Sequence, residues 1–220
     1  MCWNSDVSLN TFVFVVCSLV FLYLSNTYTK YKLKEFQNPL IYLLLFLVAA
    51  MQLVEFFLWK NLSNKSLNTL LSKAACSLVV LQLLTLIFMI PAERSRNMFL
   101  FCFMLYFILK WLFKTIFRPP THWSTTVGSN GHLSWDWMNY TGIYSGFIVA
   151  FLFMYVAALI LVGFPALSVV SISFLAVSAF YYFKHNTFGT MWCWAVNFLL
   201  LYYVLQILIV QPLYEYKSLC

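Results

Sequence analysis

The chain has 220 residues, of which 63% are hydrophobic and 9% are charged, and its formal net charge is +7. Soluble domains carry about a quarter charged residues. A mean hydropathy of +0.85 therefore excludes a water-soluble globule and indicates that most of the chain faces lipid or other helices. The basic residues are dispersed at the ends of apolar segments and form no block or tail, which excludes nucleic acid as an expected partner.

Seven runs of about 20 predominantly apolar residues predict seven membrane-spanning helices. They cover residues 8–24, 39–59, 69–90, 97–117, 143–163, 165–183 and 190–211. The runs are continuous, whereas the strands of a membrane β-barrel would alternate between apolar and polar residues. The sequence therefore predicts an all-α integral membrane protein, with residues 1–220 forming a single seven-transmembrane-helix bundle embedded in a lipid bilayer.

The charges that flank the first span predict the orientation. Summed over all flanks, basic residues divide equally between the two sides, but the first helix usually dominates. Asp6 precedes this helix, and Lys30, Lys32 and Lys34 follow it. We therefore expect an uncleaved signal anchor, an N-terminus outside and a C-terminus in the cytosol. The glycosylation sequons at Asn61, Asn64 and Asn139 fall in loops that this orientation places outside.

Residues 118–142 form the one long polar connection in the sequence. A loop of this length without a clear helix is typically functional or disordered. Tryptophans favour the membrane interface, so we expect this segment to lie as a lid over the outer end of the bundle. Its predicted lid residues are His122, Trp123, His132, Trp135, Asp136 and Trp137.

Polar side chains near the same predicted outer end indicate a pocket. Gln52, Glu55 and Trp59 share one face of the second span. An ionisable group within a membrane costs roughly 2.5–3.5 kcal/mol on insertion scales, so Glu55 requires a partner, and Lys110 lies at a similar predicted depth. Either the two form an ion pair that fixes helix packing, or they line a functional site. The predicted pocket residues are Gln52, Glu55, Trp59, Lys73, Lys110, Lys114, Trp192, Cys193 and Asn197.

A metal site is the second possibility. His122, His132, His185 and Asp136 all fall on the predicted outer side, and three histidines with a carboxylate can hold a catalytic zinc ion. Their spacing matches no known ligand motif, so we expect no metal or other cofactor. The seventh span contains no lysine that could form a retinal Schiff base.

Three segments carry a resemblance to a known family. The stretches "MQLVEFFLWKN…SNKSLNTLLSK", "NGHLSWDW" and "FGTMWCWAVN" resemble an uncharacterised family of small seven-span membrane proteins of large DNA viruses of algae and protists. The resemblance covers roughly two-thirds of the chain. It implies that the three segments belong to one unit, and it assigns no catalytic residue.

Three classes of function follow from these patterns. The leading hypothesis is a receptor-like or channel-like protein, not an enzyme, whose outward-facing polar pocket binds or conducts a small ligand or ion. The first alternative is a membrane-embedded, metal-dependent lipid hydrolase that uses the histidines and Asp136. The second alternative is a structural subunit or assembly factor of a membrane complex, in which the polar groups only fix helix packing.

Overall fold

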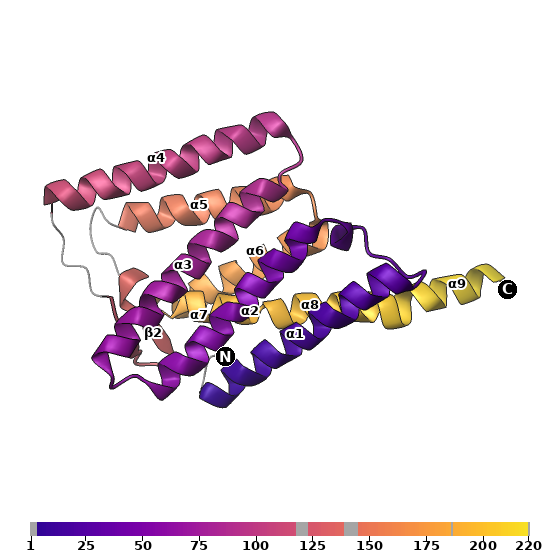
Figure 1. The fold of residues 1–220 in the computed structure, drawn as a ribbon, viewed down its shortest axis with the longest axis horizontal. Helices are drawn as coiled ribbons and strands as arrows, with labels where there is room; N and C mark the ends of the chain where they lie inside the picture. The colour runs from indigo at the N-terminus through magenta and orange to yellow at the C-terminus, as the bar shows by residue number, and fades with distance from the viewer. Residues whose placement is uncertain (1–3, 118–122, 139–144, 186, 220) are drawn as a thin grey trace.

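The computed structural model is a helical bundle with a small hairpin at one end (Figure 1). It describes residues 4–117, 123–138, 145–185 and 187–219. Within these ranges, seven helical segments are long and apolar enough to cross a membrane, which confirms the predicted all-α class and the seven spans.

Six of the spans are single helices, and the seventh is segmented. The single helices are α1 (Ser5–Tyr28), α2 (Pro39–Lys60), α3 (Lys65–Met89), α4 (Glu93–Phe117), α5 (Ser145–Val162) and α6 (Pro165–Tyr182). The seventh span consists of α7 (Phe188–Trp194), α8 (Val196–Leu205), a π-helical turn (Gln206–Val210) and α9 (Gln211–Leu219). Short 3-10 turns cover Glu35–Gln37, Asp136–Met138 and Phe183–His185.

Local sequence signals account for where the helices begin. The side chains of Asn4 and Asn64 accept hydrogen bonds from the backbone N–H groups of Val7 and Leu67, at 2.8 and 3.2 Å. These bonds satisfy donors that the first turn of a helix leaves without a partner. The turn between α5 and α6 uses Gly163 at a φ of 76°, a conformation that favours glycine. This agrees with the short interval between the predicted spans 143–163 and 165–183.

The helices differ in how extensively they pack against their neighbours. α2 packs along both α1 and α3, α1 also packs on α8, and α5 contacts α3. α4 lies at the edge of the bundle, where it packs on α3 and α5 (Figure 1). Large apolar side chains such as Phe101, Trp111 and Phe153 are exposed, as expected for surfaces that face lipid.

The long polar connection contains a β-hairpin that the sequence analysis did not predict. Strands β1 (Thr125–Val127) and β2 (Leu133–Trp135) pair antiparallel, with Thr125 opposite Trp135. The turn between the strands places Gly131 at a φ of 77°, and the N–H of Gly128 donates to the carbonyl of His132 at 2.8 Å. We call the end of the bundle that carries this hairpin the hairpin end.

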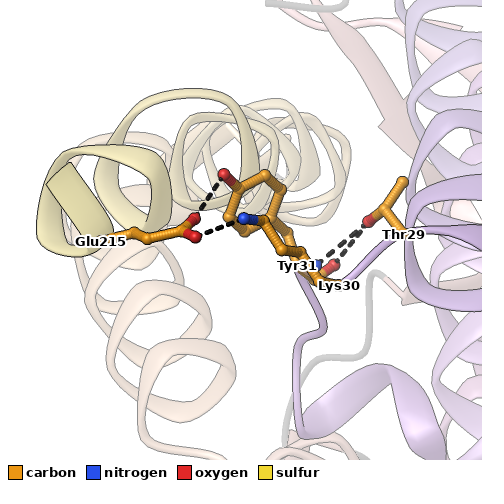
Figure 2. Close-up of polar contacts among 4 residues, drawn as sticks. All are labelled: Thr29, Lys30, Tyr31 and Glu215. Carbon is orange, nitrogen blue, oxygen red and sulfur yellow. Dashed lines mark hydrogen bonds and ion pairs between the residues drawn. The ribbon is translucent and has the colours of Figure 1, made fainter. Parts of the chain in front are cut away.

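The last helix is fastened to the α1–α2 connection at the opposite end. Lys30 forms an ion pair with Glu215 of α9, and the Tyr31 hydroxyl donates to the same carboxylate at 2.8 Å (Figure 2). The Gln211 side chain donates to the carbonyl of Lys32 at 3.1 Å. The hydrogen bond to Glu215 raises the pKa values of Lys30 and Tyr31, because it favours the protonated forms of both groups. We call these contacts the C-terminal latch.

Candidate functional site

The centre of the candidate site is Glu55 on α2, whose side chain is 0% exposed. Gln52 lies one turn away on the same face and is equally buried, and its Nε2 donates to Glu55 Oε2 at 3.0 Å. Trp59 continues this face toward the hairpin end. Its buried indole Nε1 finds no hydrogen-bond acceptor among the described residues. The face predicted from the sequence therefore turns into the bundle.

Helix α1 adds hydroxyl groups that sequence reasoning missed. Ser8 and Thr11 are buried one turn apart on α1, which runs antiparallel beside α2. Asn197 on α8 donates from Nδ2 to Thr11 Oγ1 at 3.4 Å. The signal that could have revealed this contribution is the recurrence of Ser8, Thr11 and Ser18 at helical spacing within an apolar run.

The start of the seventh span supplies the third group of side chains at the site, after those of α2 and α1. The buried Cys193 thiol on α7 lies within electrostatic range of Glu55. The helix is interrupted at Ala195, whose N–H bonds to the carbonyl of Trp192 at 3.0 Å, and α8 resumes at Val196. The Oδ1 atom of Asn197 is buried without a hydrogen-bond donor in the part of the chain that the structure describes.

Beside Cys193 lies a small internal cavity of about 40 Å³. Its polar lining includes Gln82 on α3 and Tyr155 on α5, and the Tyr155 hydroxyl donates to Gln82 Oε1 at 3.3 Å. Gln82 donates in turn to the carbonyl of Leu47 at 3.3 Å. Since a buried water needs about 10–15 Å³ and polar partners, this cavity has the size and polarity to hold water.

A second void lies between this cavity and the hairpin. It measures about 10 Å³ and shares Gln82, Trp192 and Cys193 with the first cavity, and Trp135 and Gly189 also line it. Trp192 is fixed between these spaces, because its Nε1 donates to the carbonyl of Ser171 at 3.0 Å. Gln82 was not among the predicted site residues, although its amide stands out within the apolar run "VVLQLLTLIF".

The three predicted pocket lysines lie away from Glu55. Lys73 is exposed on α3, and Lys114 is exposed on α4. Lys110 lines a different cavity, between α3, α4, α5 and the hairpin. No ion pair joins Glu55 to Lys110 among the described residues, so the expected pairing is not found. Equal depth in the membrane does not bring two side chains together when other helices lie between them.

The described lid residues are packed into the bundle. The rings of Trp135 and Trp137 stack with their centroids 5.1 Å apart, and the two residues are 2% and 9% exposed. Trp123 is half-buried. Asn68 of α3 fixes the start of the hairpin by donating to the Thr125 carbonyl and accepting from the Thr125 N–H, each at 2.9 Å. The hairpin is therefore inserted between helices.

The three possible metal ligands that the structure describes have separate surroundings. The His132 ring packs edge-on against Tyr182, and His185 shares a hydrogen bond with Ser129 at 2.8 Å. Asp136 accepts from Ser124. His122 lies outside the described residues. Within the ranges that are described, no three His, Cys, Asp or Glu side chains gather into a metal-binding group, so the lipid hydrolase stays a prediction.

The fold and the site define a seven-helix polytopic membrane protein with a buried carboxylate-centred polar cluster. No family model, curated protein or solved structure matches the chain. The resemblance to the viral seven-span family accordingly stays a prediction.

Proposed function

We propose that this protein binds a proton or a small cation at Glu55, inside the helix bundle, and that this binding is coupled to conduction or sensing across the membrane. The observation that carries the proposal is the complete burial of the Glu55 carboxylate within a membrane-spanning helix, with Gln52 bonded to it. A buried carboxylate is costly in its charged form, and the uptake of a proton or cation removes that cost.

The size of the internal space favours an ion over an organic ligand. The cavity beside Cys193 measures about 40 Å³ and the adjoining void about 10 Å³, whereas sites for drug-sized molecules have volumes of about 300–1,000 Å³. A proton needs no room beyond that of the waters and side chains that carry it. The sequence predicted a pocket for either a small ligand or an ion, and of these two the proposal keeps the ion.

The neighbouring polar groups supply a chain of exchangeable partners. Cys193 lines the same cavity as Gln82 and Tyr155, and its thiol lies within electrostatic range of Glu55. Each of these side chains can donate a hydrogen bond, and the amide and hydroxyl oxygens can also accept one. Waters in the cavity would extend this chain toward the middle of the bundle.

The test is a comparison of wild type with Glu55→Gln in phospholipid vesicles that contain a pH-sensitive dye. A potassium diffusion potential drives proton entry. In parallel, infrared difference spectra over about pH 4 to pH 10 report protonation of the carboxyl group. We expect a carboxylic-acid band and, in the conducting case, proton flux. Both should be lost in Glu55→Gln.

The matched control is Glu93→Gln, which makes the same change at an exposed position on α4. It should keep the flux and the band of wild type. An infrared band without flux would support the sensing form of the proposal. A Glu55→Gln protein that folds and reproduces every wild-type signal would refute it, and would favour the structural-subunit alternative.

A further inference from the structure

A second cavity lies at the hairpin end, between α3, α4, α5 and the turn after β2. It measures about 60 Å³ and is not lined by Glu55, Gln82 or Cys193, although it shares Val79 and Phe151 with the void of about 10 Å³ described above. Its walls are apolar side chains, including Val79, Phe107 and Phe151. Within this apolar lining stands Lys110, a residue that the Glu55 site leaves without a role.

The polar groups at this cavity are suited to a negatively charged guest. Lys110 supplies a cation, with its Nζ 5.8 Å from the centre of the Tyr106 ring. Trp137 is 9% exposed, and its buried Nε1 donor has no acceptor among the described residues. A buried donor without an acceptor is costly, and a ligand oxygen would remove that cost. No carboxylate lies among the described residues that line the cavity.

An apolar groove adjoins the cavity along the seam of α4 and α5. It measures about 320 Å³ and is lined by side chains that include Leu105, Leu109 and Met154. Tyr106 belongs to the walls of both spaces. The groove lies on an outer face of the bundle, because Leu105 and Leu109 in its walls are 40% and 49% exposed. Helix α4 itself lies at the edge of the bundle (Figure 1), where its outer surface faces lipid.

We propose that this cavity and groove bind a long-chain fatty acid, with its carboxylate beside Lys110 and the Trp137 indole N–H and its acyl chain along the α4–α5 groove. The positive charge of Lys110 favours a ligand with a negatively charged acid group. The small cavity and its single lining lysine select a compact head with one negative charge, which a carboxylate provides and a bulky phospholipid head does not. This inference is independent of proton or cation binding at Glu55.

The experiment uses the full chain in phosphatidylcholine nanodiscs, with a photoactivatable fatty acid as the probe. Crosslinked peptides are identified by mass spectrometry, and unlabelled oleate, methyl oleate and oleoyl lysophosphatidate serve as competitors. We expect labelling of α4 and α5 that oleate suppresses. Methyl oleate, which lacks the charge, should compete at least about tenfold more weakly, since hydrogen bonds to charged groups are the stronger ones.

Variants separate the headgroup contact from general lipid contact. Lys110→Met should lower the affinity at least about tenfold, and Lys110→Arg should restore most of it because the charge returns. Trp137→Phe should weaken binding severalfold. The matched control is Lys114→Met, one turn further along α4, because Lys114 is exposed and does not line the cavity. This control should bind as wild type does.

Each variant is first compared with wild type by size-exclusion profile and melting temperature, so that only folded protein is scored. Equal competition by methyl oleate and oleate would overturn the proposal, and so would equal labelling of folded Lys110→Met and wild type. Stronger competition by lysophosphatidate than by oleate would overturn the fatty acid as the occupant.

Discussion

At the scale of single residues, the bundle interior is organised by buried polar side chains that bond across helices. Gln82 joins α2 to α5 through the Leu47 carbonyl and the Tyr155 hydroxyl. Such bonds contribute about 0.6 kcal/mol on average between membrane helices. Their individual strength is therefore modest, and their main effect is to fix which faces of the helices meet.

Among the described glycines, Gly189 is the one where an added methyl group would meet the closest contact. A Cβ atom at this position would lie 2.5 Å from the ring of Trp135. We expect Gly189→Ala to destabilise the protein by about 1–3 kcal/mol, because the buried indole has little room to move. The measurement is thermal unfolding in detergent, combined with limited proteolysis of the hairpin.

The matched control for this substitution is Gly146→Ala on α5, where an added Cβ meets nothing within 4 Å. In that open helical position alanine should be neutral or stabilise by up to about 1 kcal/mol. If the two variants unfold at the same temperature, the close packing of Trp135 on α7 is wrong.

At the scale of elements, the β-hairpin is the part whose position depends most on the rest of the fold. Its turn contains Asn130-Gly131, a dipeptide typical of hairpins, between "TTV" and "HLSW". Local sequence could therefore have revealed the turn. The location of the hairpin between α3 and α7 depends on Asn68 and Gly189, which are far away in the chain.

Asn68→Ala tests how the hairpin is held. The substitution removes both hydrogen bonds to Thr125 and leaves buried backbone groups without partners, which costs about 1–3 kcal/mol for each unsatisfied group. We expect faster proteolysis within residues 123–138 and a lower melting temperature. The comparison variant is Asn61→Ala, because the Asn61 side-chain amide bonds, among the described residues, only to the Phe57 carbonyl of its own helix. If the hairpin is equally protected from proteolysis in both variants, this role for Asn68 is contradicted.

At the scale of the whole molecule, the C-terminal latch joins α9 to the α1–α2 connection (Figure 2), at the end of the bundle away from the hairpin (Figure 1). The predicted seventh span ends at residue 211, and α9 extends beyond it to Leu219. The hydrogen bond to Glu215 raises the pKa of Lys30 above its usual 10.5, so the ammonium group stays charged to a higher pH than that of a free lysine. The contribution of Lys30 is therefore complete below its usual pKa and is lost only as the pH rises through the raised value.

We expect the carbodiimide EDC, which joins amines directly to carboxylates in contact, to crosslink Lys30 to Glu215 in the intact protein at near-neutral pH. Mass spectrometry of the digested product detects the joined peptides. Since the side chains of Lys30 and Glu215 are 65% and 39% exposed, the yield should fall in about 1 M salt, where charge interactions are screened within about 3 Å. Tyr31→Phe should also lower the yield, because it removes the second bond to the carboxylate.

A crosslink from Glu215 to Lys34 that is as abundant as the one to Lys30 would contradict the latch. The Lys30→Gln variant measures the background level of crosslinking to Glu215, because it removes the reactive amine and keeps the rest of the α1–α2 connection.

The sequence by itself determined the class of the protein and its seven candidate membrane spans. Long apolar runs specify helices wherever lipid is the solvent, because backbone groups must then bond within their own segment. Helix periodicity also placed Gln52, Glu55 and Trp59 on one face, and the structure brings that face close to Cys193. These are local properties, and each can be read from neighbouring residues.

Only the tertiary structure decided which helices meet. Glu55 and Lys110 lie at similar predicted depths, yet the packing of α4 on α3 and α5 places Lys110 at a separate cavity. The same packing brought Thr11 to Asn197 and Gln82 to Tyr155. Apolar helices in lipid carry little information about their neighbours along the sequence, because the choice depends on shape and a few polar bonds between residues far apart in the chain.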